Sequence, residues 1–427
     1  MKNNEKLKIA IVGLGYVGFP LAIEFAKKGV LVTGIEIDPG RLSHLKRKES
    51  YITDVTTAEL RDVLKKGTFS ATPDFSVLKE CSAVLVCVPT PLKGKYLPDI
   101  SYIKDSLESV AKNISKNGIL VILESTTYPG TTEEIILPIF EKHNLKHGKD
   151  FYLCFSPERI DPGNKKFPVN KIPKVVGGLN AEATRRAVSL YKIIISEIIP
   201  VSSPRTAETV KLLENTFRLI NIGLIDEMAM MCHKMKIDIW EVVRAASTKP
   251  FGFMPFYPGP GVGGHCIPKD PLYLYWKAKS FGFNSRFIRL ASDIINYMPE
   301  YVTTRISEEL SKRKLSLRGA KVLVSGAAYK KDVTDLRKSP SLDIIDELKK
   351  KGAKVSYFDP LIPYLNINRI NLKSVPFEKK ELAKFDCVVV ATDHSGVDYK
   401  YLFNASKLIF DTRNVYKNTL DKKLIKL

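Results

Sequence analysis

The chain has 427 residues, of which 44% are hydrophobic and 26% are charged. At roughly 150 residues per domain, this length predicts about three domains, or two with a connector. A chain of this length can bury substantial cores, which excludes a disordered chain, a collagen-like repeat and a small disulfide scaffold. The six cysteines have neither metal-ligand nor disulfide spacing, so we expect no metal site and a reducing, cytoplasmic location.

The formal net charge is +21, from 67 Lys and Arg against 46 Asp and Glu. Such an excess suits nucleic acid, a membrane surface or small anionic ligands. The lysines are scattered, without zinc-finger spacing or an RNP-like aromatic run, so we expect no nucleic-acid partner and favour phosphorylated small molecules. The apolar run at residues 9–23 follows three lysines, as in a signal peptide, but glycines and a proline interrupt it and Glu24 ends it. We therefore expect neither secretion nor a membrane partner.

The first elements in chain order have the pattern of a dinucleotide site. Apolar spacing predicts a strand over 8–12, a helix over 17–28 and a second strand over 30–35. In the turn between strand and helix, Gly13 permits the sharp bend, Gly15 lets the backbone approach a diphosphate, and Gly18 lets the helix pack on the strand. The alternative is a glycine-rich turn in some other α/β protein.

Glu36 follows the second strand, eighteen residues after Gly18. A carboxylate at this position accepts hydrogen bonds from the adenosine ribose and repels the 2′-phosphate of NADP, so we predict NAD as the cofactor. Arg41 would either blunt that repulsion or contact the cofactor phosphates.

Three further strands are predicted over 83–88, 118–123 and 151–155. Thr90, Thr126 and Glu158 follow them and are expected to line one crevice, because ligands bind beyond the carboxyl ends of parallel strands. The alternatives are that Thr126 caps a helix and that Glu158 forms an ion pair with Arg159.

A long helix is predicted over 206–235. Lys211 and Asn215 lie four residues apart, so both side chains lie on one face. From these residues alone, Lys211 would pair with Glu208 or Glu214 at the surface.

The glycine- and proline-rich stretch 251–270 cannot be regular structure. It places Cys266 between His265 and Lys269, with Asp270 next in the chain. Nearby positive charge makes a thiol nucleophilic by lowering its pKa. The alternative is a buried structural cysteine.

The α/β rhythm returns after residue 318. Strands are predicted over 321–325, 354–358, 386–391 and 408–412, and a helix over 341–350. The loop 326–340 has one glycine where a dinucleotide site has three, so we interpret it as a mononucleotide or diphosphate site with Lys330, Lys331 and Arg337 as anion ligands. The alternative is that these lysines only solvate the loop.

These motifs together resemble the nucleotide-sugar 6-dehydrogenases, from residue 9 to about residue 415. The resemblance implies an α/β fold with two Rossmann-like domains joined by a long central helical segment. It implies an NAD domain over 1–203, a central dimerisation segment with the cysteine loop over 204–314, a UDP-binding domain over 315–427, and a homodimer.

Members of this family oxidise a primary alcohol to a carboxylate with two NAD per sugar. By resemblance, Cys266 forms a thiohemiacetal and then a thioester, Lys211 and Asn215 stabilise oxyanions, Thr126 and Asp270 hold a water, and Glu158 is a general base. The implied cofactor contacts are Gly13, Gly15, Tyr16, Val17, Gly18, Glu36, Arg41, Thr90, Ser125, Thr126 and Arg337. The implied substrate contacts are Glu158, Arg159, Lys211, Asn215, Tyr257, Gly259, Gly263, Tyr329, Lys330 and Arg413.

The expected substrate is a UDP-N-acetylhexosamine. Pro162 and His265 depart from the glucose-specific pattern, and residues 49–52 and 128–132 look like the N-acetylhexosamine branch. Residues 266–271 look more like the gluco than the manno members, which favours UDP-N-acetylglucosamine and a role in surface polysaccharide synthesis. UDP-glucose and UDP-N-acetylmannosamine are the alternative substrates. A two-electron hydroxy-acid dehydrogenase and a non-catalytic nucleotide-binding protein are the competing functions.

Overall fold

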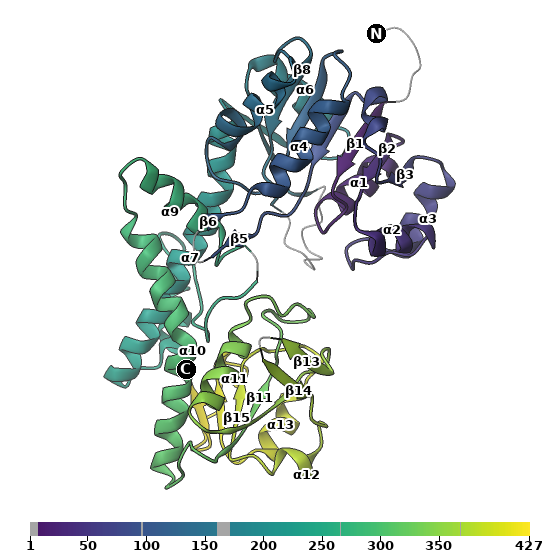
Figure 1. Ribbon diagram of the computed structural model, residues 1–427. Helices are drawn as coiled ribbons and strands as arrows, with labels where there is room; N and C mark the ends of the chain where they lie inside the picture. Colours follow the sequence, from purple (N-terminus) through teal and green to yellow (C-terminus); the bar gives the residue numbers. More distant parts are fainter. Residues whose placement is uncertain (1–6, 95–96, 160–170, 265, 368) are drawn as a thin grey trace. The chain divides into compact units, whose positions relative to one another are not determined.

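The computed structural model describes residues 7–94, 97–159, 171–264, 266–367 and 369–427 (Figure 1). The chain divides into two compact units. The first unit comprises Met1–Glu214 and Leu272–Phe283, and the second comprises Asn215–Pro271 and Asn284–Leu427.

The first unit is built on an eight-stranded sheet with the order β10-β9-β8-β7-β4-β1-β2-β3. Its strands are β1 (Lys8–Val12), β2 (Leu31–Ile35), β3 (Phe69–Thr72), β4 (Ala83–Val86), β7 (Ile119–Leu123), β8 (Phe151–Phe155), β9 (Lys174–Gly178) and β10 (Ile198–Val201). Six neighbouring strands of this sheet are parallel, in the order β3-β2-β1-β4-β7-β8. This is the dinucleotide-binding order 3-2-1-4-5-6. The strands predicted near residues 8, 30, 83, 118 and 151 are confirmed.

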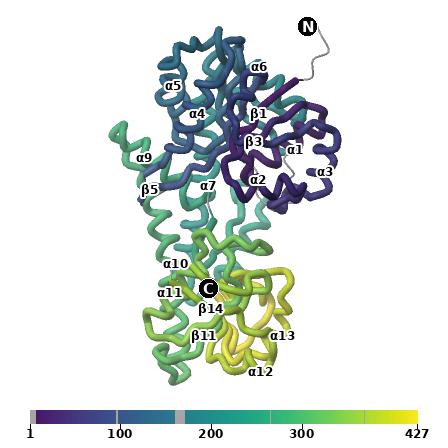
Figure 2. The backbone as a smooth tube through the Cα atoms, turned by 45° about the vertical axis from the view of Figure 1, so that its right-hand side comes forward, coloured from purple at the N-terminus to yellow at the C-terminus, as the bar shows by residue number. Residues whose placement is uncertain are grey.

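Helices cover both faces of this sheet (Figures 1 and 2). On one face, α1 (Gly18–Lys27), α3 (Thr57–Lys65) and α6 (Ala181–Tyr191) bury apolar residues with Ile9 and Ile11. On the other face, α4 (Ser101–Asn113) and α5 (Leu137–Lys142) pack with Ala10 and Val12. The alternation of side chains along β1 thus feeds two separate cores, as expected for a strand buried on both faces. Shorter elements are α2 (Pro39–Lys46), η1 (Phe75–Glu80), η2 (Thr132–Ile136), β5 (Leu92–Lys93) and β6 (Leu97–Pro98).

The reversal of β9 is a feature that the sequence analysis did not predict. β9 pairs with β8 in antiparallel register, Phe155 opposite Gly177, and β10 runs parallel to β9. The beginning of β9 therefore lies at the same edge of the sheet as the end of β8.

The predicted long helix is confirmed as α7 (Pro204–Met235), which begins in the first unit and ends in the second. The other helices of this part of the chain are α8 (Ile239–Ala246), α9 (Asp270–Ser280) and α10 (Arg286–Lys312). Asp270, which we placed in the irregular loop, is the first residue of α9. Within the described residues, no helix is both long enough and apolar enough to span a membrane.

The second unit contains a parallel five-stranded sheet with the order β12-β11-β15-β16-β17. Its strands are β11 (Lys321–Ser325), β12 (Lys354–Phe358), β15 (Cys387–Val390), β16 (Ile409–Asp411) and β17 (Leu424–Lys426). This is the second common doubly wound order, 2-1-3-4-5, so a second Rossmann-like sheet is confirmed. Helices α10 and α11 (Pro340–Lys350) cover one face, and α12 (Lys379–Leu382) and α13 (Tyr399–Ala405) cover the other. β13 (Tyr364–Ile367) and β14 (Ile370–Lys373) form an antiparallel hairpin.

Candidate functional site

The three glycines of the first turn have different surroundings. Gly13 has φ +88°, and a Cβ there would lie 2.8 Å from the Cys87 carbonyl oxygen. A Cβ on Gly18 would lie 2.0 Å from the Gly13 oxygen, so both positions require glycine for the fold itself. A Cβ on Gly15 would meet only an Arg41 nitrogen at 3.9 Å, and Tyr16 beside it is exposed. The protein's own packing does not require glycine at position 15. The open space above Gly15 instead fits the approach of a cofactor diphosphate.

The beginning of α1 also suits an anion. No side chain caps this end of the helix at Val17, and its first turn contains no acidic residue. Backbone N–H groups and the helix dipole favour negative charge at such an end. The residues present therefore fit NAD.

Glu36 is buried at the end of β2 and is surrounded by donors. Its Oε2 accepts from the Leu14 N–H at 3.0 Å and from Arg41 Nη1 at 3.0 Å. Its Oε1 accepts from the N–H groups of Ile37 and Asp38. We predicted that Glu36 binds the ribose and disfavours NADP, and the structure shows that this carboxylate also ties the glycine turn to β2.

Two predicted cofactor residues lie at the carboxyl ends of the central strands. Ser125, after β7, donates to the Val88 carbonyl oxygen at 2.8 Å and so links the ends of β7 and β4. The backbone oxygen of Thr90 accepts from the Tyr273 hydroxyl at 2.7 Å. Both residues are buried at the edge where the crevice was predicted.

Lys211 and Thr126 are brought together, although they are far apart in sequence. Lys211 Nζ donates to Thr126 Oγ1 at 2.6 Å. Glu208 instead accepts from the Gly130 and Thr132 N–H groups, and Glu214 pairs with Arg159. The interpretation of Lys211 as a partner of Glu208 or Glu214 is therefore wrong, because Lys211 binds Thr126 and both carboxylates have other donors.

Glu158 lies beyond β8 and pairs with a different cation from the one considered. Its Oε2 lies 3.1 Å from Lys174 Nζ, whereas the Arg159 guanidinium lies 2.6 Å from Glu214 Oε1. A side-chain ion pair between neighbours Glu158 and Arg159 is thus wrong. Arg159 also donates to the Pro173 oxygen at 2.9 Å, which fixes it beside α7.

Within the second unit, the glycine-rich loop before Cys266 packs against the loop 326–340, which follows β11. A Cβ on Gly263 would lie 2.5 Å from Tyr329 Cβ, and one on Gly261 would lie 3.3 Å from the Ile295 oxygen of α10. The Gly264 N–H donates to the Arg337 oxygen at 2.9 Å. These close approaches explain why the loop is rich in glycine.

Cys266 is exposed, whereas the other five cysteines are buried. Its carbonyl oxygen accepts from the Asp270 N–H at 2.8 Å, which places the residue just before α9. Asn215 Nδ2 donates to Asp270 Oδ2 at 2.8 Å, so α7 is tied to the end of the cysteine loop. The interpretation of Cys266 as a buried structural cysteine is wrong.

A buried acid supports the same loop from α7. Asp226 Oδ1 accepts from the Gly259 N–H at 2.9 Å, and burial raises the pKa of this carboxyl to about 8, although Arg413 opposes the shift. Tyr257 is exposed and stacks on Trp240 of α8 with ring centroids 6.3 Å apart.

A pocket of about 390 Å³ lies at the switch point of the second sheet. It is lined by residues that follow β11, β15 and β16, namely Lys331, Asp393, His394, Ser395, Tyr399, Arg413, Asn414, Val415 and Lys417. Doubly wound sheets bind ligands at this point, so the predicted anion ligand Lys331 is suitably placed. Arg337 is instead held by Asp335, with Nη2 2.6 Å from Oδ2.

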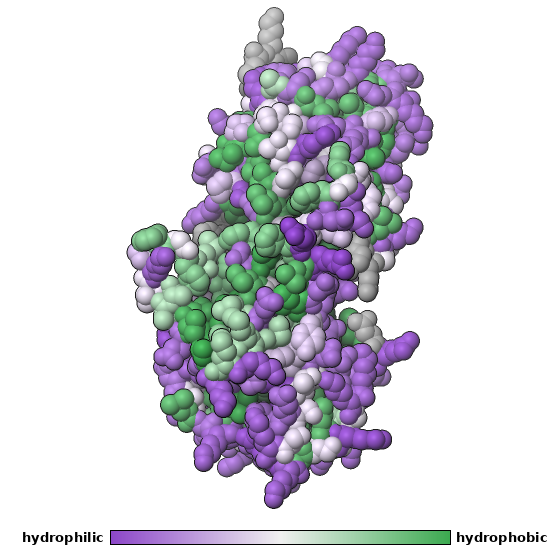
Figure 3. Space-filling model, turned by 90° about the vertical axis from the view of Figure 1, so that its left-hand side faces the viewer, coloured by the Kyte–Doolittle hydropathy of each residue, from purple (hydrophilic) through white to green (hydrophobic). Residues whose placement is uncertain are grey.

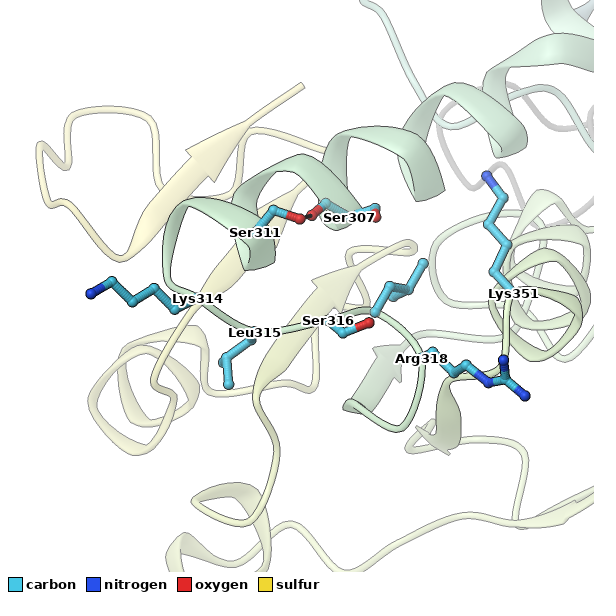
Figure 4. A pocket seen from close by; sticks show the side chains of 8 residues that line it. Ser307, Ser311, Lys314, Leu315, Ser316, Arg318 and Lys351 are labelled. Atoms are coloured by element: carbon cyan, nitrogen blue, oxygen red, sulfur yellow. Dashed lines mark hydrogen bonds between the residues drawn. The ribbon is translucent and has the colours of Figure 1, made fainter.

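Figure 4 shows a larger pocket of about 570 Å³ in the second unit. Ser307 and Ser311 line it from α10, with Arg318 from the segment before β11 and Lys351 from the end of α11. It lies at the amino edge of the sheet, opposite the edge where such sheets bind ligands. None of the predicted site residues lines it. Pro162 and His265, which we used to choose the sugar, lie outside the described residues.

The first sheet's strand order and its glycine turn place the chain, by fold and site, among the Rossmann-type dehydrogenases that bind NAD. Comparison with known proteins narrows this class. The chain belongs to the UDP-glucose/GDP-mannose dehydrogenase family. The family's NAD binding domain matches residues 7–195, its central domain 205–297 and its UDP binding domain 323–418. The protein is thus an NAD-dependent dehydrogenase of UDP-sugars.

Individual relatives cover most of the chain. It is 40% identical over 360 residues to a UDP-N-acetyl-D-glucosamine 6-dehydrogenase of Pseudomonas aeruginosa, and the match covers 84% of each chain. It is 35% identical over 423 residues to a UDP-N-acetyl-D-mannosamine dehydrogenase of Pyrococcus horikoshii, 96% of each chain. A solved structure of the Pyrococcus horikoshii UDP-D-ManNAc dehydrogenase has a TM-score of 0.89 and 32% identity, and covers 98% of this chain and 99% of that one.

Several buried polar residues at these sites escaped the sequence analysis. They are Glu124, Lys174, Tyr191, Asp226, Asp359 and His394. Single charged residues in apolar surroundings were the available signal, as with Glu124 directly after a strand. A sequence does not show which of them find partners.

Proposed function

We propose that the protein is a UDP-N-acetyl-D-glucosamine 6-dehydrogenase that oxidises C6 of the sugar to a carboxylate and serves surface polysaccharide synthesis. The observation that carries the four-electron chemistry is the exposed thiol of Cys266, at the end of a glycine loop tied to α7 by Asn215 and Asp270. The motifs at residues 49–52 and 128–132 support an N-acetylhexosamine. Residues 266–271 and the relative of the same activity from Pseudomonas aeruginosa support the gluco sugar.

The reaction balances as one alcohol, two NAD⁺ and one water giving one carboxylate, two NADH and three protons. The glycine turn and Glu36 would hold NAD⁺, which would supply the hydride acceptor for C6 in each of the two oxidations. The first oxidation leaves an aldehyde, to which the Cys266 thiolate adds as its sulfur forms a bond to C6. The second oxidation converts this thiohemiacetal to a thioester. Water then attacks the thioester carbonyl, the C–S bond breaks, and the thiolate is restored.

The other residues act on charge and protons. Lys211 and Asn215 would donate hydrogen bonds to the oxyanion of each tetrahedral intermediate, and the loss of one such donor costs about 3 kcal/mol. The water of the proton path would be held by Thr126 and Asp270. Thr126 accepts from Lys211, and Asp270 accepts from Asn215. Glu158 would remove a proton from the hydrolytic water.

The test combines a substrate panel with a thiol variant. UDP-N-acetylglucosamine, UDP-N-acetylmannosamine, UDP-glucose and UDP-galactose are each supplied with NAD while NADH absorbance is followed. We expect about two NADH per UDP-N-acetylglucosamine, and Cys266→Ala should bind the UDP-sugar without turnover. Cys387→Ala, a buried cysteine of the second sheet, is the control for loss of a thiol. One NADH per substrate, or full turnover by Cys266→Ala, would contradict the proposal.

UDP-N-acetylmannosamine is the second candidate substrate. The Pyrococcus horikoshii relative that acts on it aligns with a larger share of this chain than the Pseudomonas aeruginosa protein does. The same panel decides between them through the ratio of kcat/KM for the two sugars.

We also propose that the protein acts as a cytoplasmic homodimer. Hydrophobic side chains gather on the outer face of the central helices (Figure 3). Phe217, Leu224 and Met231 of α7 are exposed and spaced by seven residues, so they form one stripe along the helix. A second copy of the chain would bury this stripe, as expected for an exposed apolar patch.

A further inference from the structure

A buried ammonium group lies between two carboxylates beyond the central strands of the first sheet. Glu124 follows β7, Glu158 lies beyond β8, and Lys174 begins β9. In the antiparallel register of β8 and β9, Phe155 faces Gly177, and an extension of this register places residue 158 opposite Lys174. The reversal of β9 thus delivers a lysine to the edge where Glu158 lies.

The contacts show that this lysine is shared. Lys174 Nζ lies 2.6 Å from Glu124 Oε2 and 3.1 Å from Glu158 Oε2. The side chain of Lys174 is 6% exposed, that of Glu124 0% and that of Glu158 9%. The second oxygen of Glu124 accepts from the Tyr191 hydroxyl of α6, and that of Glu158 accepts from the Arg159 N–H at 2.6 Å.

We propose that Lys174, shared with Glu124, is a positioning residue that holds the Glu158 carboxylate ionised and orients it for the removal of a proton from water. The inference rests on the general-base role given to Glu158 above. With all three groups charged, the cluster carries one net negative charge. When Glu158 takes a proton from the attacking water, the remaining Lys174–Glu124 pair is neutral, so the proton enters without leaving an unpaired buried charge.

The described groups that face this cluster are either neutral or paired elsewhere. Burial lowers the pKa of Lys174, but attraction to both carboxylates outweighs it and holds the pKa above its usual value. Burial raises the pKa of the facing Cys87 thiol and of the Tyr191 hydroxyl, which keeps both neutral. Among the described residues, the neighbouring guanidinium of Arg159 is paired with Glu214 of α7.

Two substitutions should move the ionisation of Glu158 in opposite directions. In Lys174→Met, two buried carboxylates lie together without a cation, so they share a proton, and the acid limb of kcat should move to higher pH by about one pH unit or more. In Glu124→Gln, the ammonium serves Glu158 alone, so the acid limb should move to lower pH. Lys174→Arg keeps the positive charge and should largely restore the wild-type profile.

The chain offers a matched control for the loss of a shared lysine. Lys27 also bridges two carboxylates, Glu24 at 2.7 Å and Glu59 at 2.6 Å, but its side chain is 32% exposed. It is the last residue of α1, away from the carboxyl edge of the sheet. Lys27→Met should leave the acid limb where it is in the wild type.

A second measurement separates this proposal from the choice of sugar and from the thiol chemistry. In substrate-free protein with NAD absent, infrared difference spectra over pH follow the C=O stretch of protonated carboxyls, with Glu158→Gln as the reference that identifies Glu158. The same opposite shifts are expected there, even if UDP-N-acetylglucosamine proves to be the wrong substrate. Glu124→Gln provides the test if Lys174→Met does not fold.

Three results would overturn the proposal. The first is a Lys174→Met protein that is less stable but has an unmoved Glu158 titration. The second is a shift in the same direction for Lys174→Met and Glu124→Gln. The third is a Glu158→Gln enzyme with wild-type kcat, which would remove the base that Lys174 is proposed to position.

Discussion

Glu36 and Asp359 occupy equivalent positions, each directly after the second strand of its sheet. Glu36 accepts from the N–H of Leu14, and Asp359 accepts from the N–H of Ala327 at 2.7 Å. Asp359 also accepts from His394 Nε2 at 3.1 Å, because His394 Nδ1 accepts from the Asp332 N–H. In both units, one carboxylate therefore fixes the first loop of the sheet.

The double role of Glu36 leads to a prediction for Glu36→Gln. The amide removes the negative charge that disfavours the 2′-phosphate, so the ratio of kcat/KM for NAD over NADP should fall. An amide N–H₂ facing backbone N–H donors should also cost about 1–3 kcal/mol of stability. Steady-state kinetics with both cofactors and thermal unfolding provide the measurements. An unchanged cofactor ratio would show that Glu36 only supports the turn, and Glu49→Gln at the surface is the control.

Asp226 makes stability depend on pH. Its folded-state pKa is about 8, against an ordinary value of 3.8, so its contribution to stability is complete at low pH and is lost as pH rises through about 8. The wild type should therefore lose up to about 1.4 kcal/mol per pH unit between pH 4 and 8 relative to Asp226→Asn. Unfolding midpoints of both proteins at pH 6 and pH 9 test this. Parallel changes in wild type, Asp226→Asn and the surface control Asp62→Asn would refute it.

At the scale of elements, the turn before α1 separates glycines needed by the fold from the glycine needed by the ligand. Gly18→Ala should destabilise strongly, because its Cβ would overlap the Gly13 oxygen at 2.0 Å. Gly15→Ala should keep the melting temperature close to that of the wild type, since nothing of the protein lies within 3.9 Å of its Cβ. Its affinity for NAD, measured by calorimetry, should nevertheless fall. Normal NAD binding by Gly15→Ala would contradict the placement of the diphosphate.

For the complete protein, the exposed stripe on α7 predicts self-association. Leu224 is 54% exposed and Met231 is 45% exposed, one heptad apart. The double variant Leu224→Glu, Met231→Glu should sediment as a monomer at concentrations where the wild type is a dimer, because two charges would be buried in an apolar interface. Leu420→Glu, at a fully exposed position, should leave the dimer intact. A wild type that sediments as a monomer would contradict the proposed homodimer.

Local sequence patterns were enough to predict most of the helices and strands. Apolar periodicity and the glycine turn predicted the strands around residues 8, 30 and 83, the helix α7 and the second α/β sheet, and all are confirmed. It also singled out Cys266, which the structure shows to be exposed. These features are local, because a strand, a turn or a helix depends on residues close together in the chain.

The contacts between side chains from distant parts of the chain could not be predicted in this way. Lys211 contacts Thr126, Arg159 contacts Glu214, and Lys174 lies between Glu124 and Glu158. The last arrangement depends on the reversal of β9, for which periodicity gives no signal because a parallel and an antiparallel strand can have the same apolar pattern. Partners separated by 50 or 85 residues are chosen by packing and by the cost of burying an unpaired charge, and neither can be read from the order of residues alone.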